Sequence, residues 1–201
     1  MRRRLVLATR NPGKVREFRR LLEGFDVDLV GLDETGVTVE VDETGSTFED
    51  NAVLKAKAYA AATGELVIAD DSGLEVDALG GQPGVMSARY GGPGLDDKGR
   101  VQKLLDELKD VRGWKRTARF RAVVAIAGAG VPGGVQTAEG VVEGAIAHEP
   151  IGKNGFGYDP VFWIASQAKT TAELSGEAKD SLSHRGAAVR KMLPILEKIL
   201  G

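Results

Sequence analysis

Two adjacent carboxylates, Asp70 and Asp71, are the strongest chemical signal in this sequence. They follow an apolar run at residues 67–69 and precede a serine and a glycine. Such a run predicts a buried strand, so both acids are expected where the strand leaves the sheet, the edge at which ligands bind in open α/β sheets. Neighbouring carboxylates repel each other, and a hard cation such as Mg²⁺ relieves the repulsion because it prefers oxygen ligands. A solvated acidic turn is the alternative interpretation.

A second candidate, at residues 9–14, has the composition of an anion site. Residues 4–8 predict a strand, and Asn11 and Pro12 are suited to cap and begin the helix that follows. A helix N-terminus presents N–H groups and a positive dipole end, and Arg10 and Lys14 add charge, so a phosphate is expected there. The segment lacks two residues that a Walker A loop requires. An ordinary turn with surface cations is the alternative.

An acidic segment and the helix after it provide further candidates. Ser46 and Glu49 have the spacing of a capping box, which predicts a helix that runs to about Thr63 and ends at Gly64. Lys55 lies on this helix. An exposed helix lysine is its ordinary interpretation, and a lysine that faces the same site as the acids is the alternative.

The second half of the chain contains an aromatic loop and a charged helix start. Glycines flank Phe156, and Tyr158 follows. Glycine lets the backbone approach a flat ligand, and an aromatic ring offers a stacking face; a plug over the core is the alternative. His184 and Arg185 fall in the first turn of the last helix, where cations oppose the helix dipole and an acceptor opposite them is indicated. Two solvated surface residues are the alternative there.

The remaining pattern predicts the elements that hold these groups. Strands are expected at residues 28–32, 119–127, 135–146 and 161–164, and a helix at 96–109. The two longer strands are expected to pair antiparallel, and Pro194 is expected to kink or shorten the last helix. We interpret Arg116, Arg119 and Arg121 as a solvated strand face and His148 as a surface residue.

Composition limits the function classes. The 201 residues suit one domain, or one domain with a lobe, and the formal net charge of −2 gives no basic field for nucleic acid or an anionic membrane. The absence of cysteine excludes disulfides and thiolate chemistry and fits a reducing cytosol. No apolar stretch has the length of a membrane span or of a signal peptide. We therefore expect a soluble, cytoplasmic protein that binds neither nucleic acid nor membrane.

Six segments in this order resemble the inosine triphosphate pyrophosphatase family, also described as XTP/dITP diphosphatases or non-canonical purine nucleoside triphosphate pyrophosphatases. The resemblance covers nearly the whole chain and is carried by residues 7–14, 47–52, 69–74, 83–90, 155–160 and 183–186. It implies Mg²⁺-dependent hydrolysis of ITP, dITP or XTP to the monophosphate and pyrophosphate, which cleanses the nucleotide pool, and a homodimer. We expect an α/β fold with an elongated, mixed, twisted central sheet flanked by helices. Residues 1–201 would form a single domain of two lobes with the nucleotide cleft between them.

Position by position, the resemblance implies a role for each candidate. The triphosphate would be bound by Thr9, Arg10, Asn11, Pro12, Gly13 and Lys14, with Lys55 near the phosphates. Asp71 matches the proton acceptor and a metal ligand, and Ser72 a substrate contact. The base and ribose would be held by Phe156, Gly157, Tyr158, Asp159, Lys179, His184 and Arg185. The family often carries a metal-binding Glu where this chain has Asp42 followed by Glu43, so both remain candidates for direct contact with the ion. Asp70 is a candidate for a position beyond the direct ligands.

The mechanism that we expect is proton abstraction from water by Asp71 and in-line attack at the α-phosphorus. Lys14, Arg10 and Lys55 would stabilise the departing pyrophosphate, and His184 and Arg185 would donate to the 6-oxo group of the base. Two rival functions are a pyrophosphatase for modified pyrimidine or canonical nucleotides and a non-catalytic nucleotide-binding module. The near-neutral charge disfavours a nucleic-acid-binding protein.

Overall fold

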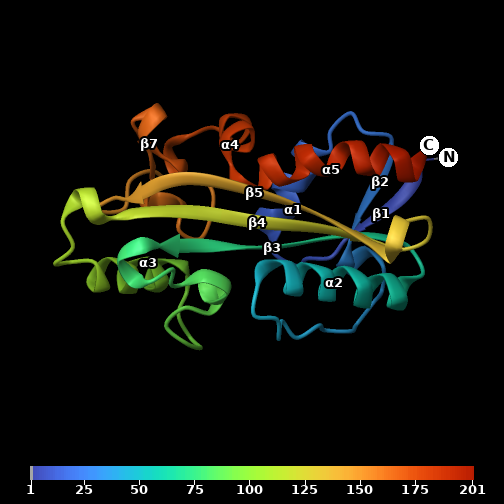
Figure 1. The fold of residues 1–201 in the computed structure, drawn as a ribbon, viewed down its shortest axis with the longest axis horizontal. Coiled ribbons are helices and arrows are strands. Elements are labelled where there is room, and N and C mark those ends of the chain that lie inside the picture. The colour runs from blue at the N-terminus through green and yellow to red at the C-terminus, as the bar shows by residue number, and fades with distance from the viewer. Residues whose placement is uncertain (1) are drawn as a thin grey trace. The chain divides into compact units, whose positions relative to one another are not determined.

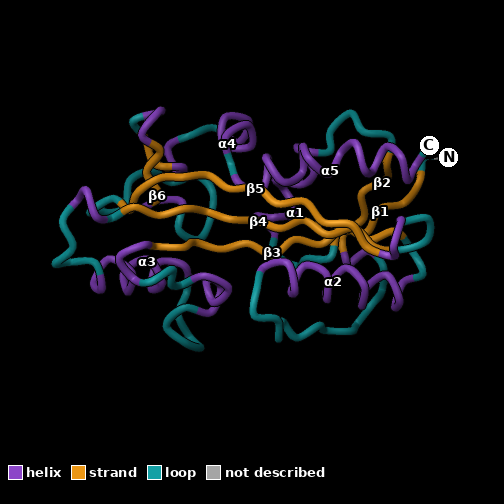
Figure 2. The backbone as a smooth tube through the Cα atoms, in the orientation of Figure 1, coloured by secondary structure: helices purple, strands orange, loops and turns teal. Residues whose placement is uncertain are grey.

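A computed structural model describes residues 2–201 of the protein (Figure 1). Within these residues a seven-stranded sheet has the order β2-β1-β3-β4-β5-β6-β7. Figure 2 shows its strands in orange. The strands are β1 (Arg3–Leu7), β2 (Val27–Gly31), β3 (Leu66–Val76), β4 (Thr117–Ala127), β5 (Val135–Ile146), β6 (Phe162–Ile164) and β7 (Lys169–Thr170). The α-helices are α1 (Pro12–Leu21), α2 (Phe48–Thr63), α3 (Asp97–Glu107), α4 (Gly176–Leu182) and α5 (His184–Leu200). No helix in this part of the chain is long and apolar enough to cross a membrane.

The sheet is mixed, as the sequence predicts. β1 runs parallel to β2 and to β3, whereas β6 runs antiparallel to β5 and to β7. The chain divides into two compact units. The first unit comprises Met1–Asp71, Ala122–Gly140 and His184–Gly201, and the second comprises Ser72–Arg121 and Val141–Ser183. Each unit has its own apolar core.

In the first unit, alternate residues of β3 face different helices. Leu66 and Ile68 belong to an apolar core that includes Phe18 of α1 and Met192 of α5. Successive side chains of a strand point to opposite faces. Val67 and Ala69, which are also buried, therefore point away from this core. α2 lies on the opposite side of these strands from α5 (Figure 1). The same alternation predicts that the next two side chains on β3, Asp70 and Asp71, point to opposite faces of the strand.

In the second unit, a separate core joins β3, β4, β6 and α3. Leu74, Leu104, Phe120 and Phe162 are among its buried residues, and the two phenylalanine rings have centroids 4.5 Å apart. Offset or tilted ring pairs at this distance add to the stabilisation that burial provides.

The structure corrects three predictions about the elements. β3 does not end before Asp70 but continues through both acids to Val76. The capping box of α2 lies one residue later than predicted, because Thr47 accepts from the amide of Asp50 at 3.0 Å and Asp50 accepts from the amide of Thr47 at 3.1 Å. Pro194 does not shorten α5, which continues through it to Leu200 with apolar residues of its last turn packed against the core.

Arg116 is buried, which corrects its assignment to a solvated face. Its guanidinium donates to the carbonyls of Leu108 at 2.7 Å and of Ile146 and Ala147 at 2.9 Å, and the residue is only 2% exposed. Three carbonyl acceptors replace water, which is why the charge tolerates burial. His148 is exposed, as predicted.

Candidate active site

The N-terminus of α1 forms as the sequence predicts. The side-chain oxygen of Asn11 accepts from the amides of Gly13 at 2.8 Å and Lys14 at 3.2 Å, and Pro12 is the first helical residue. This cap fixes the direction in which α1 leaves β1 and brings the Lys14 side chain to β3. Arg10 instead contacts Asp33 at 3.4 Å and donates to the carbonyl of Val37.

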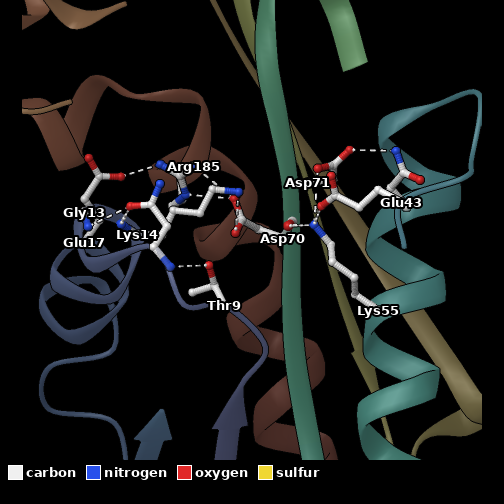
Figure 3. Close-up of polar contacts among 11 residues, drawn as sticks. Thr9, Gly13, Lys14, Glu17, Glu43, Lys55, Asp70, Asp71 and Arg185 are labelled. Atoms are coloured by element: carbon white, nitrogen blue, oxygen red, sulfur yellow. Dashed lines mark hydrogen bonds and ion pairs between the residues drawn. The ribbon is translucent and has the colours of Figure 1, made fainter. Parts of the chain in front are cut away.

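Asp70 and Asp71 point to opposite faces of β3 (Figure 3). Asp70 continues the face of Ile68 and meets residues of α1 and α5, whereas Asp71 continues the other face and meets α2. The two carboxylates are therefore separated by the strand itself, and each has its own cation. Lys14 and Arg185 balance the charge of Asp70, and Lys55 balances that of Asp71.

The face toward α1 and α5 holds a buried charge network. Asp70 contacts the ammonium of Lys14 at 3.1 Å and the guanidinium of Arg185 at 2.9 Å, and Arg185 also pairs with Glu17 (Figure 3). Burial raises the pKa of the Asp70 carboxyl, but Lys14 and Arg185 outweigh it, so this pKa lies well below its ordinary value. Burial lowers the pKa of Lys14. Asp70 is thus an ionised anchor for both cations.

On the face toward α2, both carboxylate oxygens of Asp71 accept hydrogen bonds. Asn51 donates to Oδ2 at 3.2 Å, and the ammonium of Lys55 donates to Oδ1 at 3.2 Å. The same ammonium contacts the carboxylate of Glu43 at 2.5 Å and the carbonyl of Asp70 at 2.7 Å. Lys55 is 8% exposed, so the structure shows the buried lysine rather than the ordinary solvated one.

Burial and neighbouring charges shift the pKa values of Asp71 and Lys55. Burial raises the pKa of Asp71, and the nearby carboxylates of Glu43 and Asp70 act in the same direction. Burial alone would lower the pKa of Lys55, but Asp71, Asp70 and Glu43 outweigh it and raise the pKa. A carboxylate with a raised pKa accepts a proton more readily than an ordinary one, which suits a general base.

The donor set on this face fits a hard divalent cation. Glu43 and Asp71 both contact one ammonium, so their oxygens converge on a common positive centre. No group of three His, Cys, Asp or Glu side chains suited to a metal occurs within residues 2–201. Mg²⁺ typically uses one or two carboxylates and completes its shell with water and substrate phosphate, so a pair of acids is sufficient.

A separate group lies in the second unit, around Asp159. Its carboxylate accepts from the amide of Phe156 at 2.8 Å and from the hydroxyl of Thr171 at 2.9 Å, and it pairs with the ammonium of Lys179. That ammonium lies 4.8 Å from the centroid of the Phe156 ring. A Cβ on Gly155 would lie 2.0 Å from the Asp159 carboxylate, and the φ of Gly155 is +78°, so any other residue would displace the carboxylate and strain the loop. The ring and the charges are thereby held as one group.

Some of the residues predicted for the site contact one another in the structure, and others do not. Glu43 reaches Lys55, whereas Asp42 is exposed. His184 and Arg185 are buried at 6% and 1% exposure, so their interpretation as solvated residues is wrong. Tyr158 donates through its hydroxyl to the carbonyl of Ser87, and the amide of Gly157 donates to Asp97. Thr9 accepts a hydrogen bond from the amide of Asn11 at 3.2 Å, Pro12 is exposed, and Ser72 follows Asp71 on β3.

Sequence reasoning missed three polar residues that hold these groups: Glu17, Asn51 and Thr171. All are nearly fully buried. Asn51 precedes Lys55 by one helical turn beside an alanine-rich stripe, and this pair of polar residues at i and i+4 is a signal that indicates a shared partner. No comparable signal marks Glu17 or Thr171.

Comparison with known proteins places the chain in a family. The Ham1 family profile matches residues 5–195. The chain belongs to the Ham1 family. A relative from Bacillus subtilis (strain 168), named dITP/XTP pyrophosphatase, is 50% identical over 193 residues, which cover 96% of each chain. A dITP/XTP pyrophosphatase from Desulforamulus reducens is 51% identical over 197 residues, covering 98% of this chain and 96% of the relative.

Solved structures of Ham1 proteins have the same fold. The Staphylococcus aureus Ham1 protein has a TM-score of 0.85 and 42% identity, with 97% of this chain and 98% of that chain covered. A HAM1 protein from Coxiella burnetii has a TM-score of 0.87 and 40% identity, with 98% and 99% covered. These matches confirm the α/β fold and the family resemblance that the six sequence segments predict.

Proposed function

We propose that this Ham1 protein hydrolyses the non-canonical purine nucleoside triphosphates ITP, dITP and XTP to the monophosphate and pyrophosphate. The observation that carries the proposal is the Asp71 carboxylate, which is held from both sides by Asn51 and Lys55 and faces Glu43 across one ammonium. The names of the relatives, dITP/XTP pyrophosphatases, supply the substrate class.

The proposed chemistry assigns the proton transfer to Asp71. Its carboxylate accepts a proton from water, the water oxygen bonds to the α-phosphorus, and the bond from that phosphorus to pyrophosphate breaks. Lys14, Lys55 and Arg10 stabilise the negative charge of the departing pyrophosphate. Glu43 and Asp71 would hold Mg²⁺, which when bound polarises phosphate oxygens. We choose Glu43 over Asp42 because Glu43 contacts Lys55 and Asp42 is exposed.

We assign base recognition to the group around Asp159, together with His184 and Arg185. The Phe156 ring supplies a stacking face, and stacking of a base on an aromatic side chain is worth about 1–3 kcal/mol. Donors directed at the 6-oxo group of the base would reject the 6-amino group of adenine, because the mismatch leaves polar groups unpaired. The proposal also includes a homodimer in the cytoplasm, which rests on the family resemblance and on the location of the nucleotide pool.

Pyrophosphate release from ITP, dITP, XTP, ATP and a modified pyrimidine triphosphate tests this function, with MgCl₂ and with EDTA. We expect release from the first three substrates, little from ATP, and loss of release in EDTA. Release from the pyrimidine or from ATP at an equal rate would contradict the substrate assignment. Binding of ITP without release would indicate a nucleotide-binding module, and undiminished release in EDTA would contradict the role of Mg²⁺.

A further inference from the structure

Asn51 is a buried polar residue to which the proposed mechanism assigns no chemistry. It lies on α2 and is 1% exposed. Its Oδ1 accepts a hydrogen bond from the amide of Gly45 at 2.7 Å, and its Nδ2 donates to Oδ2 of Asp71 at 3.2 Å. One carboxamide therefore joins the loop before α2 to the middle of β3.

These two partners fix the orientation of the carboxamide. A backbone amide only donates, so Oδ1 must face Gly45, and an ionised carboxylate only accepts, so Nδ2 must face Asp71. Rotation by 180° would place oxygen against the carboxylate and N–H against N–H. Because the side chain is buried, both mismatched contacts would cost free energy that water cannot recover.

Lys55 makes a second connection between the same two segments. It follows Asn51 by four residues, so the two side chains lie on one face of α2. Lys55 holds Oδ1 of Asp71 and the carboxylate of Glu43, and Asn51 holds Oδ2 of Asp71 and the amide of Gly45. Both oxygens of Asp71 are thus restrained from one helix, and so is the loop that carries Glu43.

The loop touches Asn51 directly because residue 45 is glycine. A Cβ at Gly45 would lie 2.7 Å from Oδ1 of Asn51 and 2.5 Å from Cβ of Asp50. Any other residue would push the loop away from α2. The position of Glu43, two residues earlier, therefore depends on this contact.

We propose that Asn51 is a positioning residue that sets the Asp71 carboxylate and the Glu43 loop relative to each other. The inference rests on the proposed function of that carboxylate pair. Asn51 touches neither substrate nor metal in this role; it determines where the oxygens that do so are held. Groups that orient metal-binding side chains usually cost about 10–100-fold in metal affinity or activity when they are removed.

Two substitutions separate the two ends of the carboxamide. Asn51→Asp keeps an acceptor for Gly45 but places an oxygen against Asp71, whereas Asn51→Leu has similar volume and removes both contacts. Thr63→Val is the matched control, because it removes a hydrogen bond of 2.7 Å to Tyr59 on the same helix, outside the site. Thermal unfolding of each variant establishes that it is folded.

Three readouts test the inference. Amide hydrogen exchange reports on Gly45, Mn²⁺ binding without nucleotide is measured by electron paramagnetic resonance, and kcat and KM for ITP are measured at saturating Mg²⁺. We expect Asn51→Leu to expose the Gly45 amide to exchange, weaken Mn²⁺ binding about tenfold or more and lower kcat about tenfold or more. Asn51→Asp should keep the Gly45 amide protected and still lower kcat. KM should change less than threefold in both variants.

The inference is overturned if folded Asn51→Asp has a kcat within twofold of the unsubstituted protein. It is equally overturned if Asn51→Leu retains both Mn²⁺ affinity and Gly45 protection. Failure of the proposed function looks different, because the unsubstituted protein would then release no pyrophosphate, while exchange and Mn²⁺ binding would still report on Asn51. If the unsubstituted protein bound no Mn²⁺, the metal assignment would fail and kcat would decide the role of Asn51.

Discussion

Asp70 and Asp71 are consecutive in the chain, yet their carboxylates lie on opposite faces of β3 and bind different cations. Asp70 contacts Lys14 and Arg185, and Asp71 contacts Lys55 (Figure 3). The period of two along the strand produces this separation. One acid is thereby available as a structural anchor while its neighbour keeps a raised pKa suited to proton transfer.

Asp71→Asn tests the proton acceptor. An asparagine side chain has the same shape and keeps one acceptor oxygen, but it cannot take a proton from water. We therefore expect kcat for ITP to fall about 10²–10⁴-fold while KM changes little. Steady-state kinetics measure both constants. Asp77→Asn is the control, because Asp77 is an exposed carboxylate in the second unit. Retention of full activity by Asp71→Asn would remove Asp71 from this role.

Lys55→Met tests the shared cation between Glu43 and Asp71. Its removal leaves the buried Asp71 and the partly buried Glu43 without their common partner, and breaking a buried pair costs about 3–5 kcal/mol. We therefore expect Tm in EDTA to fall by about 5 °C or more. MgCl₂ should raise the Tm of this variant more than that of the unsubstituted protein, because a divalent cation restores the missing charge.

Lys57→Met is the matched control for this experiment, because Lys57 is exposed on the same helix. Its Tm should match that of the unsubstituted protein in EDTA and in MgCl₂. Equal Mg²⁺-induced shifts in Lys55→Met and in the unsubstituted protein would show that the cation does not bind beside Glu43 and Asp71.

Asp70→Asn tests the pH dependence of stability. The pKa of Asp70 in the folded protein lies below the ordinary value of 3.8, so its contribution is fully present above pH 3.8 and is lost as the pH falls through the folded pKa. Urea unfolding at pH 7 and 5 should show the same loss of stability for Asp70→Asn, and at pH 3 a smaller one. Asp26→Asn, at an exposed ion pair, should show no measurable loss. A difference that grows toward acid pH would refute this assignment.

Local chemistry explains which parts of the fold the sequence predicts. Asn11 and Gly64 act within one turn of their own helices, so the start of α1 and the end of α2 are predicted at the right residues. Alternating apolar residues likewise predict β4 and β5 within two residues. These signals do not depend on distant contacts.

The sequence does not predict which charged residues are buried, because the groups that pair with them are far away in the sequence. Arg185 and Asp70 are 115 residues apart, and Arg116 is satisfied by carbonyls up to 31 residues away. Nothing near Asp70 in the sequence identifies the cations that make a buried carboxylate tolerable, since Lys14 and Arg185 come from α1 and α5. The seven residues of α4 are too few for a periodic apolar pattern, so this helix is missed.

Arg185→Lys tests base discrimination. In the structure the guanidinium donates to Asp70 and pairs with Glu17, and lysine cannot reproduce this planar fork. The variant should therefore be less stable. A loss of stability alone affects ITP and ATP alike, whereas loss of a donor to the 6-oxo group affects ITP only. The ratio of kcat/KM for ITP to that for ATP separates the two effects.

We expect that ratio to fall about tenfold or more in Arg185→Lys, the size of a lost charge-assisted hydrogen bond. Arg19→Lys is the control, because Arg19 is an exposed arginine of α1 that pairs with Glu34. It should change neither Tm nor the ratio. If Arg185→Lys lowers Tm and leaves the ratio unchanged, Arg185 serves only to hold Asp70 and Glu17. Base selection would then belong to His184 and the residues around Asp159.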